Sequence, residues 1–308
     1  MPSAPQPHLL ALFAMPKSFD FSLQSLQQLA QSDVTRALAE DVGTGDLTAS
    51  LIAPHRMTVA RVLARESAVL CGQAWVQAAV LQCDPQARIT WHVQDGQRCE
   101  ANQVVLEITG RAQALLTAER TALNFLQLLS GVATKTATYV AVVAGTKAHI
   151  VDTRKTIPGL RVAQKYAVRC GGGTNHRVGL YDAVLIKENH IAAAGGIAQV
   201  MQAAAPIAAQ ADFVEIEVET LEQLTEALNV GAKMVLLDNM SLPTLHEAVR
   251  INTAKGKQAI LEISGGVTLD GLRALAETGV DRISIGTLTK DVQSIDYSMR
   301  FEALPEAQ

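Results

Sequence analysis

The sequence predicts an α/β protein whose C-terminal half is built from βα units and whose N-terminal half is an α+β domain. From His149 onward, short apolar runs recur about every 20 to 35 residues, and each precedes a helical pattern. These runs cover 148–151, 183–186, 213–216, 234–237, 259–263 and 282–285. Polar residues or glycines follow them, as in a βα barrel that builds its active site at the C-terminal strand ends. An open doubly wound sheet is the alternative, but no GxGxxG follows the first strand.

The N-terminal half mixes the two kinds of element. Apolar spacing predicts helices over 21–39, 73–82 and 115–129, and alternation predicts strands over 57–70, 88–93 and 103–108. The strand–turn–strand segment around Asp95-Gly96 resembles the hammerhead-like modules of biotinyl and lipoyl carriers, although its tip lacks a lysine. We expect an N-terminal domain over 1–130, a catalytic βα domain over 131–289, and a segment 290–308 that returns to the first domain. Residues 1–20 have a Pro-rich start, which favours a disordered tail.

Composition limits the class of protein. The 308 residues are 48% apolar, which allows a sizeable core and argues against global disorder. A net charge of −4 and 4% aromatic residues disfavour a nucleic-acid-binding module. Apolar runs stay well short of the roughly 20 residues that span a bilayer, so we expect a cytoplasmic protein without membrane contact. The four cysteines form no CxxC and are expected to be free thiols.

One segment carries an unusual charge. Residues 147–187 contain eight Lys or Arg and only two acids, hence +6 within a chain of net −4. Such a cationic island in an acidic protein indicates a small, strongly anionic ligand. Gly171-Gly-Gly173 frees the backbone for close approach to a ligand, and arginine forks suit carboxylates or phosphates. A soluble flexible loop is the plain alternative, but these features occur together after strand-like runs.

The chain also resembles a known family. DTRKTIPGLR, KYAVRCGGGTNHRVGL and LIKENH in this island are similar to signature segments of the quinolinate phosphoribosyltransferases. Further similar segments lie at 40–48, 119–131, 215–220, 236–241 and 262–266, so the resemblance covers the chain from about residue 20 to its end.

The resemblance implies a reaction and an assembly. Quinolinate and phosphoribosyl pyrophosphate would give nicotinate mononucleotide, carbon dioxide and pyrophosphate, with Mg²⁺, in NAD biosynthesis. It favours an incompletely closed, TIM-like βα barrel for the catalytic domain. It also implies a homodimer in which Arg120 enters the active site of the neighbouring subunit, with a higher oligomer left open.

The resemblance further assigns residues. Catalytic roles fall to Lys155, Lys187, Glu217 and Asp238, with the two acids serving ribose hydroxyls and Mg²⁺, directly or through water. Quinolinate would bind Arg120, Arg154, His176, Arg177 and Lys187, with Arg154 and Arg177 as the main carboxylate forks. Ser264, Gly265, Gly266 and Gly286 would hold the 5′-phosphate on backbone N–H groups.

Three other functions stay open at this point. The chain could be a phosphoribosyltransferase for another pyridine carboxylate, a molybdenum-associated homologue of the same fold, or an inactive sensor of phosphoribosyl pyrophosphate. The complete RKT, HR and IKENH segments favour quinolinate, and no key Lys, Arg or acid is missing.

Overall fold

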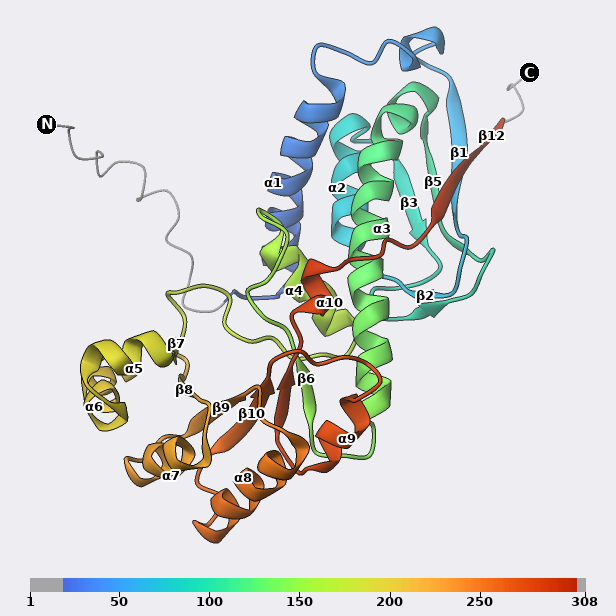
Figure 1. Ribbon diagram of the computed structural model, residues 1–308. Coiled ribbons are helices and arrows are strands. Elements are labelled where there is room, and N and C mark those ends of the chain that lie inside the picture. The colour runs from blue at the N-terminus through green and yellow to red at the C-terminus, as the bar shows by residue number, and fades with distance from the viewer. Residues whose placement is uncertain (1–18, 304–308) are drawn as a thin grey trace, which may run out of the picture.

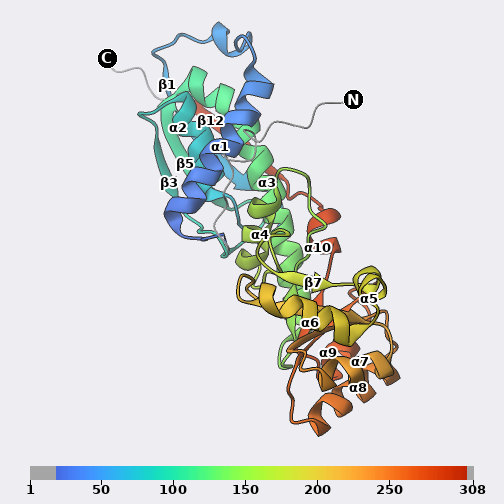
Figure 2. The same ribbon diagram turned by 90° about the vertical axis from the view of Figure 1, so that its left-hand side faces the viewer.

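The computed structural model describes residues 19–303, so the tail expected before residue 19 lies outside the described residues. Two bodies stand end to end, and the long helix α3 (Ala112–Val143) runs through both of them (Figures 1 and 2). The upper body contains the N-terminal elements and the lower body contains the parallel sheet.

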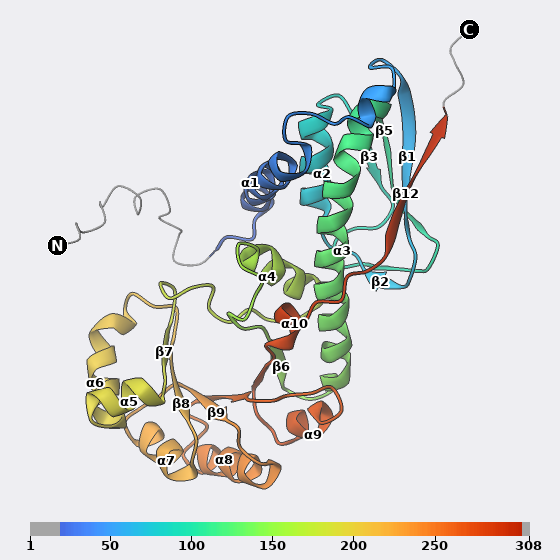
Figure 3. The same cartoon turned by 45° about the horizontal axis from the view of Figure 1, so that its top comes forward.

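The N-terminal body is an antiparallel sheet covered on one face by helices (Figure 3). The sheet order is β12-β1-β5-β3. Its strands are β1 (Met57–Ala64), β3 (Arg88–Trp91), β5 (Val104–Arg111) and β12 (Tyr297–Ala303), and its helices are α1 (Leu23–Val42), α2 (Gln73–Cys83) and the first half of α3. A short turn, η2 (Ala49–Leu51), and a small ribbon of β2 (Ala68–Val69) with β4 (Arg98–Cys99) complete it. The sequence pattern at 57–70 is therefore two strands, β1 and β2, rather than one.

The C-terminal segment returns to this first domain. Strand β12 pairs antiparallel with β1, from Thr58 opposite Ala303 to Ala64 opposite Tyr297. Tyr297 is buried there, and its hydroxyl donates to Ser130 Oγ at 3.2 Å.

The second body is a six-stranded parallel sheet in the order β6-β11-β10-β9-β8-β7. The strands are β6 (His149–Val151), β7 (Val184–Ile186), β8 (Val214–Val218), β9 (Met234–Asp238), β10 (Ile260–Ser264) and β11 (Arg282–Ser284). Its helices are α5 (Glu188–Ala194), α6 (Ile197–Ala208), α7 (Leu221–Asn229), α8 (Leu242–Ala254), α9 (Leu272–Glu277) and α10 (Thr287–Lys290). Consecutive strands are neighbours except β6, which pairs with β11 and leaves the barrel open beside β7. The expected incomplete βα barrel with an N-terminal α+β domain is confirmed.

Helix α3 is much longer than the predicted 115–129. Ser130-Gly131 looks like a helix end, but Gly131 is there for close packing, since a Cβ on it would lie 2.2 Å from the carbonyl oxygen of Gln293. By length and composition α3 could cross a membrane, yet half of that window is buried inside the protein. One end of α3 packs in the N-terminal core and the other in the barrel core, which makes it the shared core helix of the two bodies.

Helix α4 (Arg161–Cys170) follows β6 but does not cover the barrel. Its buried residues Ala163, Ala167 and Val168 belong to the N-terminal core. The chain after α4 then comes back beside β6, where Thr174 N–H donates to Ile150 O at 2.8 Å. This return places Gly171–Arg177 at the open side of the barrel.

Candidate active site

The C-terminal ends of the six parallel strands form one mouth, and most of the residues predicted from the sequence lie there. Arg154 and Lys155 follow β6, and Lys187 follows β7. Glu217 lies in β8, while Asp238 and Ser264 end β9 and β10. Parallel strands end at the same edge, so Arg154 and Ser264, which are 110 positions apart in the sequence, lie at one mouth.

Lys187, Glu217 and Asp238 form one side of the mouth. Lys187 Nζ lies 3.1 Å from Glu217 Oε2. Burial raises the pKa of Glu217, the ammonium of Lys187 opposes that shift, and the Asp238 carboxylate adds to it. The two carboxylates therefore sense each other at the ends of adjacent strands, as two groups that share one cation would.

The predicted phosphate loop after β10 is shaped by a close contact. Ser264 pairs with Asp238 across β10 and β9, and Asn239 N–H donates to Ser264 O at 3.1 Å. Gly265 has φ +98°, and a Cβ on it would lie 2.0 Å from Asn239 Oδ1. Gly266 has φ +54° with open space around it. Only glycine fits at Gly265.

Gly286 and Lys155 meet on the opposite side of the mouth. A Cβ on Gly286 would lie 2.8 Å from Lys155 Cδ, so the missing side chain gives the lysine room. The Thr289 hydroxyl donates to Lys155 O at 2.8 Å, and Lys155 N–H donates to Thr153 Oγ1 at 3.0 Å. These bonds fix the backbone of the DTRKT segment, from which the exposed side chain of Lys155 extends.

Arg154 and Arg177 bring two guanidinium groups together. Burial and the charge of Arg154 both lower the pKa of Arg177. Arg177 Nη1 donates to Ala183 O at 3.2 Å, whereas the buried Nε of Arg154 has no hydrogen-bond partner among residues 19–303. Asp182 and Glu215 partly offset this effect on the pKa of Arg177, but neither forms an ion pair with the two guanidinium groups among the described residues. Two neighbouring guanidinium groups of this kind suit a bound dianion.

His176 lies beneath this pair rather than on the surface. Its ring is buried, and both ring nitrogens have partners: Arg177 N–H donates to Nδ1 at 2.8 Å, and Nε2 lies 2.8 Å from Glu215 Oε2. Burial lowers the pKa of His176 to about 4 and raises the pKa of Glu215 to about 7. The contact at neutral pH is thus a hydrogen bond from a neutral imidazole rather than an ion pair.

The cationic island divides into binding and structural members. Lys165 is fully buried and pairs with Asp152, which also accepts from His176 N–H at 2.8 Å. Burial lowers the pKa of Lys165 and raises that of Asp152, because desolvation outweighs their attraction. Three further cations of the island make structural contacts: Lys147 pairs with Asp281, Arg169 covers the Phe21 ring, and Arg161 donates to Val178 O. The neutral Asn175 also donates to Asp152.

Arg120 lies away from the mouth of its own chain. It is exposed on the first half of α3 and bonds to no residue of the mouth within the described range. Lys135, whose ammonium donates to Thr287 O at 2.8 Å, marks the level of the mouth on α3. The 15 residues between them span about 22 Å of helix, which is farther than an arginine side chain extends.

Sequence reasoning missed Asn239 and the charged residues inside the barrel. Asn239 adopts φ +52° and donates to Asp238 Oδ2 at 2.8 Å, so it orients an acid of the mouth. Glu215, Glu262 and Arg282 meet below His176. Charged residues within otherwise apolar strand patterns were the available signal for these three.

Glu217 and Asp238 are the carboxylates at the mouth that could hold a metal ion. Glu217 and Asp238 present oxygen donors at an accessible strand edge, the donor type that Mg²⁺ prefers. Two other groups have ligand atoms close together, one made of Cys71, Asp95 and Cys170 and one made of His176, Glu215 and Glu262. Asp95 already accepts from Gly72 N–H and the Tyr166 hydroxyl, and all four cysteines are free, as expected.

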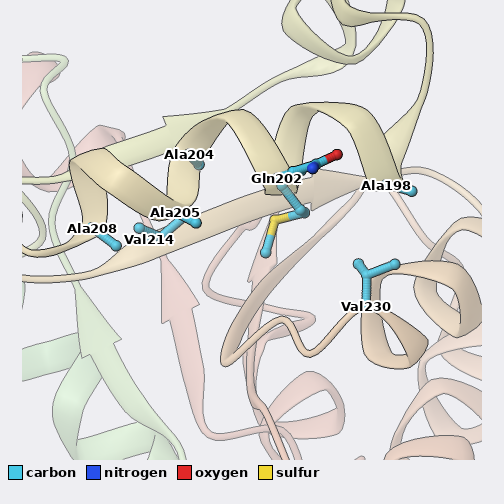
Figure 4. A pocket seen from close by; sticks show the side chains of 8 residues that line it. Ala198, Gln202, Ala204, Ala205, Ala208, Val214 and Val230 are labelled. Atoms are coloured by element: carbon cyan, nitrogen blue, oxygen red, sulfur yellow. The ribbon is translucent and has the colours of Figure 1, made fainter.

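A hollow of about 370 Å³ lies away from the mouth, along α6 (Figure 4). Its lining contains no charged side chain and consists of Ala198, Met201, Gln202, Ala204, Ala205, Ala208, Val214 and Val230. Such a surface cannot neutralise a dianion, so the charged mouth is the candidate active site.

Comparisons with known proteins identify the family of this chain. Residues 46–130 match the family description "Quinolinate phosphoribosyl transferase, N-terminal domain", and residues 132–300 match the corresponding C-terminal domain. A probable nicotinate-nucleotide pyrophosphorylase [carboxylating] of Bacillus subtilis is 42% identical over 84% of this chain and 89% of its own length. The Mycobacterium leprae enzyme of that name is 40% identical over 88% and 96%.

A solved structure gives the same result. The nicotinate-nucleotide pyrophosphorylase from Francisella tularensis superposes with a TM-score of 0.86 at 45% identity, over 90% of this chain and 97% of that one. Both domains are matched in order and the relatives align along nearly their whole length. This chain therefore belongs to the quinolinate phosphoribosyltransferase family.

Proposed function

We propose that this chain transfers the phosphoribosyl group of phosphoribosyl pyrophosphate to quinolinate, with decarboxylation, to give nicotinate mononucleotide in NAD biosynthesis. Family membership carries the reaction. The observation that supports it in this chain is the mouth itself, where Arg154 and Arg177 bring two guanidinium groups together while Lys187 lies beside Glu217 and Asp238.

Quinolinate is the substrate that suits the paired arginines. Its two carboxylates lie on adjacent ring carbons, and Arg154 and Arg177 offer two planar forks at one place. The buried Nε of Arg154 supplies a donor that is satisfied when a carboxylate binds. His176, below them, supports the Arg177 backbone.

Phosphoribosyl pyrophosphate fits the rest of the mouth. Lys155 and Lys187 supply compact positive charges for the pyrophosphate, and Glu217 and Asp238 suit the ribose hydroxyls. The loop Ser264–Gly266, with Gly286, offers backbone N–H groups that no side chain shields. Each of these residues lies at or just after the C-terminal end of a barrel strand, which is why we assign them to one ligand.

Mg²⁺ is the cofactor that we propose, with Glu217 and Asp238 holding it directly or through water. The fit rests on the two oxygen donors of adjacent strands and on the raised pKa of Glu217, which a cation would relieve. When bound, the ion would neutralise charge on the pyrophosphate.

The chemistry needs orientation and charge more than proton transfer. The pyridine nitrogen bonds to ribose C1 as the bond from C1 to the pyrophosphate oxygen breaks, with oxocarbenium character at C1. Lys155 and Lys187 stabilise the negative charge that develops on the leaving group. The pyridinium then takes the electron pair of the carbon–carbon bond as carbon dioxide leaves, and that ring carbon takes up a proton. Arg154 and Arg177 hold the ring in place through both steps.

We also propose a homodimer in which Arg120 of each chain completes the other chain's site. Arg120 is exposed and about 22 Å of helix separates it from the level of its own mouth. We also propose that the protein is cytoplasmic.

The test mixes the purified protein with quinolinate, phosphoribosyl pyrophosphate and Mg²⁺ and follows nicotinate mononucleotide and carbon dioxide together. Both products are expected in equal amounts, and nicotinate itself should not serve as substrate. A folded protein that binds phosphoribosyl pyrophosphate but forms neither product would contradict the proposal and favour a sensor.

A further inference from the structure

The interior of the barrel is charged where such barrels are usually filled by branched apolar side chains. Glu215 of β8 and Glu262 of β10 are both fully buried, and Arg282 of β11 lies beside Glu262 in the sheet register. The His176 ring enters from the segment after α4. Burying charged side chains costs free energy, so this group departs from the usual apolar barrel interior without an evident gain in stability.

The contacts make one network. His176 Nε2 lies 2.8 Å from Glu215 Oε2 and 3.6 Å from Glu262 Oε1. Glu262 also accepts from the Ser284 hydroxyl, and its Oε2 lies 2.6 Å from Arg282 Nε. The ring of His176 links this buried group to Arg177, whose backbone N–H donates to Nδ1.

The network fixes the tautomer of His176. Nδ1 accepts the Arg177 backbone N–H at 2.8 Å, so Nδ1 carries no proton and the neutral ring carries its proton on Nε2. Glu215 is the nearer acceptor for that proton. Without an acceptor below, Nδ1–H would become possible, and the Arg177 N–H would lose its partner.

We infer that Glu215, backed by Glu262 and Arg282, is a positioning residue: it holds His176 in the Nε2–H tautomer and so fixes Arg177 where a substrate carboxylate binds. The inference rests on the proposed function for the identity of that substrate. Glu215, Glu262 and Arg282 would thereby serve the binding of quinolinate and not that of phosphoribosyl pyrophosphate, because Arg177 is one of the two proposed quinolinate arginines.

Two substitutions separate this role from simple packing. Glu215→Leu keeps a side chain of similar size but removes the acceptor, whereas Glu215→Gln keeps a carbonyl oxygen that accepts from Nε2–H. Glu219→Gln is the matched control, because Glu219 follows the same strand and is exposed.

Glu215→Leu should change the KM for quinolinate much more than the KM for phosphoribosyl pyrophosphate. Loss of a buried hydrogen bond in Glu215→Leu should raise the KM for quinolinate about tenfold or more. The KM for phosphoribosyl pyrophosphate should change by less than about twofold, because that ligand uses other residues of the mouth. Glu215→Gln should recover the quinolinate KM to within about threefold, and Glu219→Gln should match the wild type.

A spectroscopic measurement makes the test independent of turnover. The ¹⁵N shifts of the His176 ring, assigned by comparison with His176→Asn, should show the Nε2–H tautomer in the wild type and in Glu215→Gln, and its loss in Glu215→Leu. If Glu215→Leu does not fold, the wild-type tautomer and the kinetics of Glu215→Gln decide.

Two outcomes would overturn the inference. One is an Nδ1–H or charged ring in the wild type at neutral pH. The other is a folded Glu215→Leu whose two KM values stay unchanged or rise together. Wild-type protein that shows the Nε2–H tautomer but does not turn over quinolinate would count against the proposed function and leave the positioning of Arg177 standing.

Discussion

Lys187 Nζ lies 3.1 Å from Glu217 Oε2, and this contact joins the ends of β7 and β8 at the mouth of the barrel. The lysine side chain is 46% exposed and the glutamate side chain 11% exposed. A partly exposed pair contributes little to stability. The proposed function gives this pair another role, in which the ammonium of Lys187 leaves the carboxylate and meets the leaving pyrophosphate.

Lys187→Ala should therefore lose activity but keep its fold. We expect kcat to fall at least about 100-fold, the scale for loss of one group that stabilises developing charge. The melting temperature should stay close to that of the wild type. Lys147→Ala is the control, because Lys147 forms a similar half-exposed pair with Asp281 at the other end of the barrel. Near-normal turnover of Lys187→Ala would remove this residue from the site.

Arg154→Ala should weaken quinolinate binding and lose most turnover. Within residues 19–303 the buried Nε of Arg154 has no hydrogen-bond partner and its guanidinium forms no ion pair, so its removal takes away a fork beside Arg177. Arg154→Lys should recover only part of the activity, because an ammonium cannot make the bidentate contact. Steady-state kinetics with Arg273→Ala, a surface arginine paired with Glu277, provide the comparison. Full activity of Arg154→Lys would argue against a bidentate role.

Gly265→Ala should be far more harmful than Gly266→Ala. A Cβ at Gly265 would overlap Asn239 Oδ1, and Asn239 holds Asp238. At Gly266 the Cβ meets open space, and only the left-handed backbone costs about 1 kcal/mol. Urea unfolding and the KM for phosphoribosyl pyrophosphate measure both effects. Equal behaviour of the two variants would refute the contact as the reason for the glycine.

Mixing two inactive variants tests the shared site. In a heterodimer of Arg120→Ala and Lys187→Ala, one site has its own Lys187 and an intact Arg120 of the partner subunit. After random exchange of equal amounts, about a quarter of the sites should be complete in a twofold-symmetric dimer. Activity near that level supports the proposal, and none after verified exchange of subunits contradicts it.

The buried His176 should make the free energy of unfolding increase as the pH rises from about 4 to 6.5. Its pKa is about 4 in the folded protein and near 6.5 when unfolded, so the unfolded chain binds more protons between these values. The stabilisation is complete above about pH 6.5 and is lost as the pH falls towards 4, an effect on the order of 3 kcal/mol. The difference in unfolding free energy between the wild type and His176→Asn should therefore grow from pH 4 to 6.5 and then level off. A constant difference would disprove a neutral buried imidazole.

The fold class and the family could be predicted from the sequence because both depend on local patterns. Six apolar runs, each ended by a polar residue or glycine, indicate parallel strands whose ends meet, and the predicted barrel and α+β domain are confirmed. The DTRKT and IKENH segments come at the ends of two of these apolar runs, and in the structure they lie at the ends of β6 and β7. The length of α3 was missed, because a glycine that permits close packing looks like one that ends a helix.

The charges of the cationic island could not be sorted from the sequence. Lys155 and Lys165 look alike there, yet one faces the mouth and the other is buried against Asp152. The depth of a side chain depends on which elements pack around it, and α4 packs on the N-terminal core rather than on the barrel.

By itself, therefore, the sequence determined the family, the order of the elements and the residue types at the mouth. The tertiary structure alone decided which of those charges face a ligand, that His176 supports Arg177 from below, and that Arg120 lies too far from its own mouth to serve it. The physical reason is that identity follows from residue patterns, whereas exposure, pKa and reach follow from contacts between segments distant in the chain.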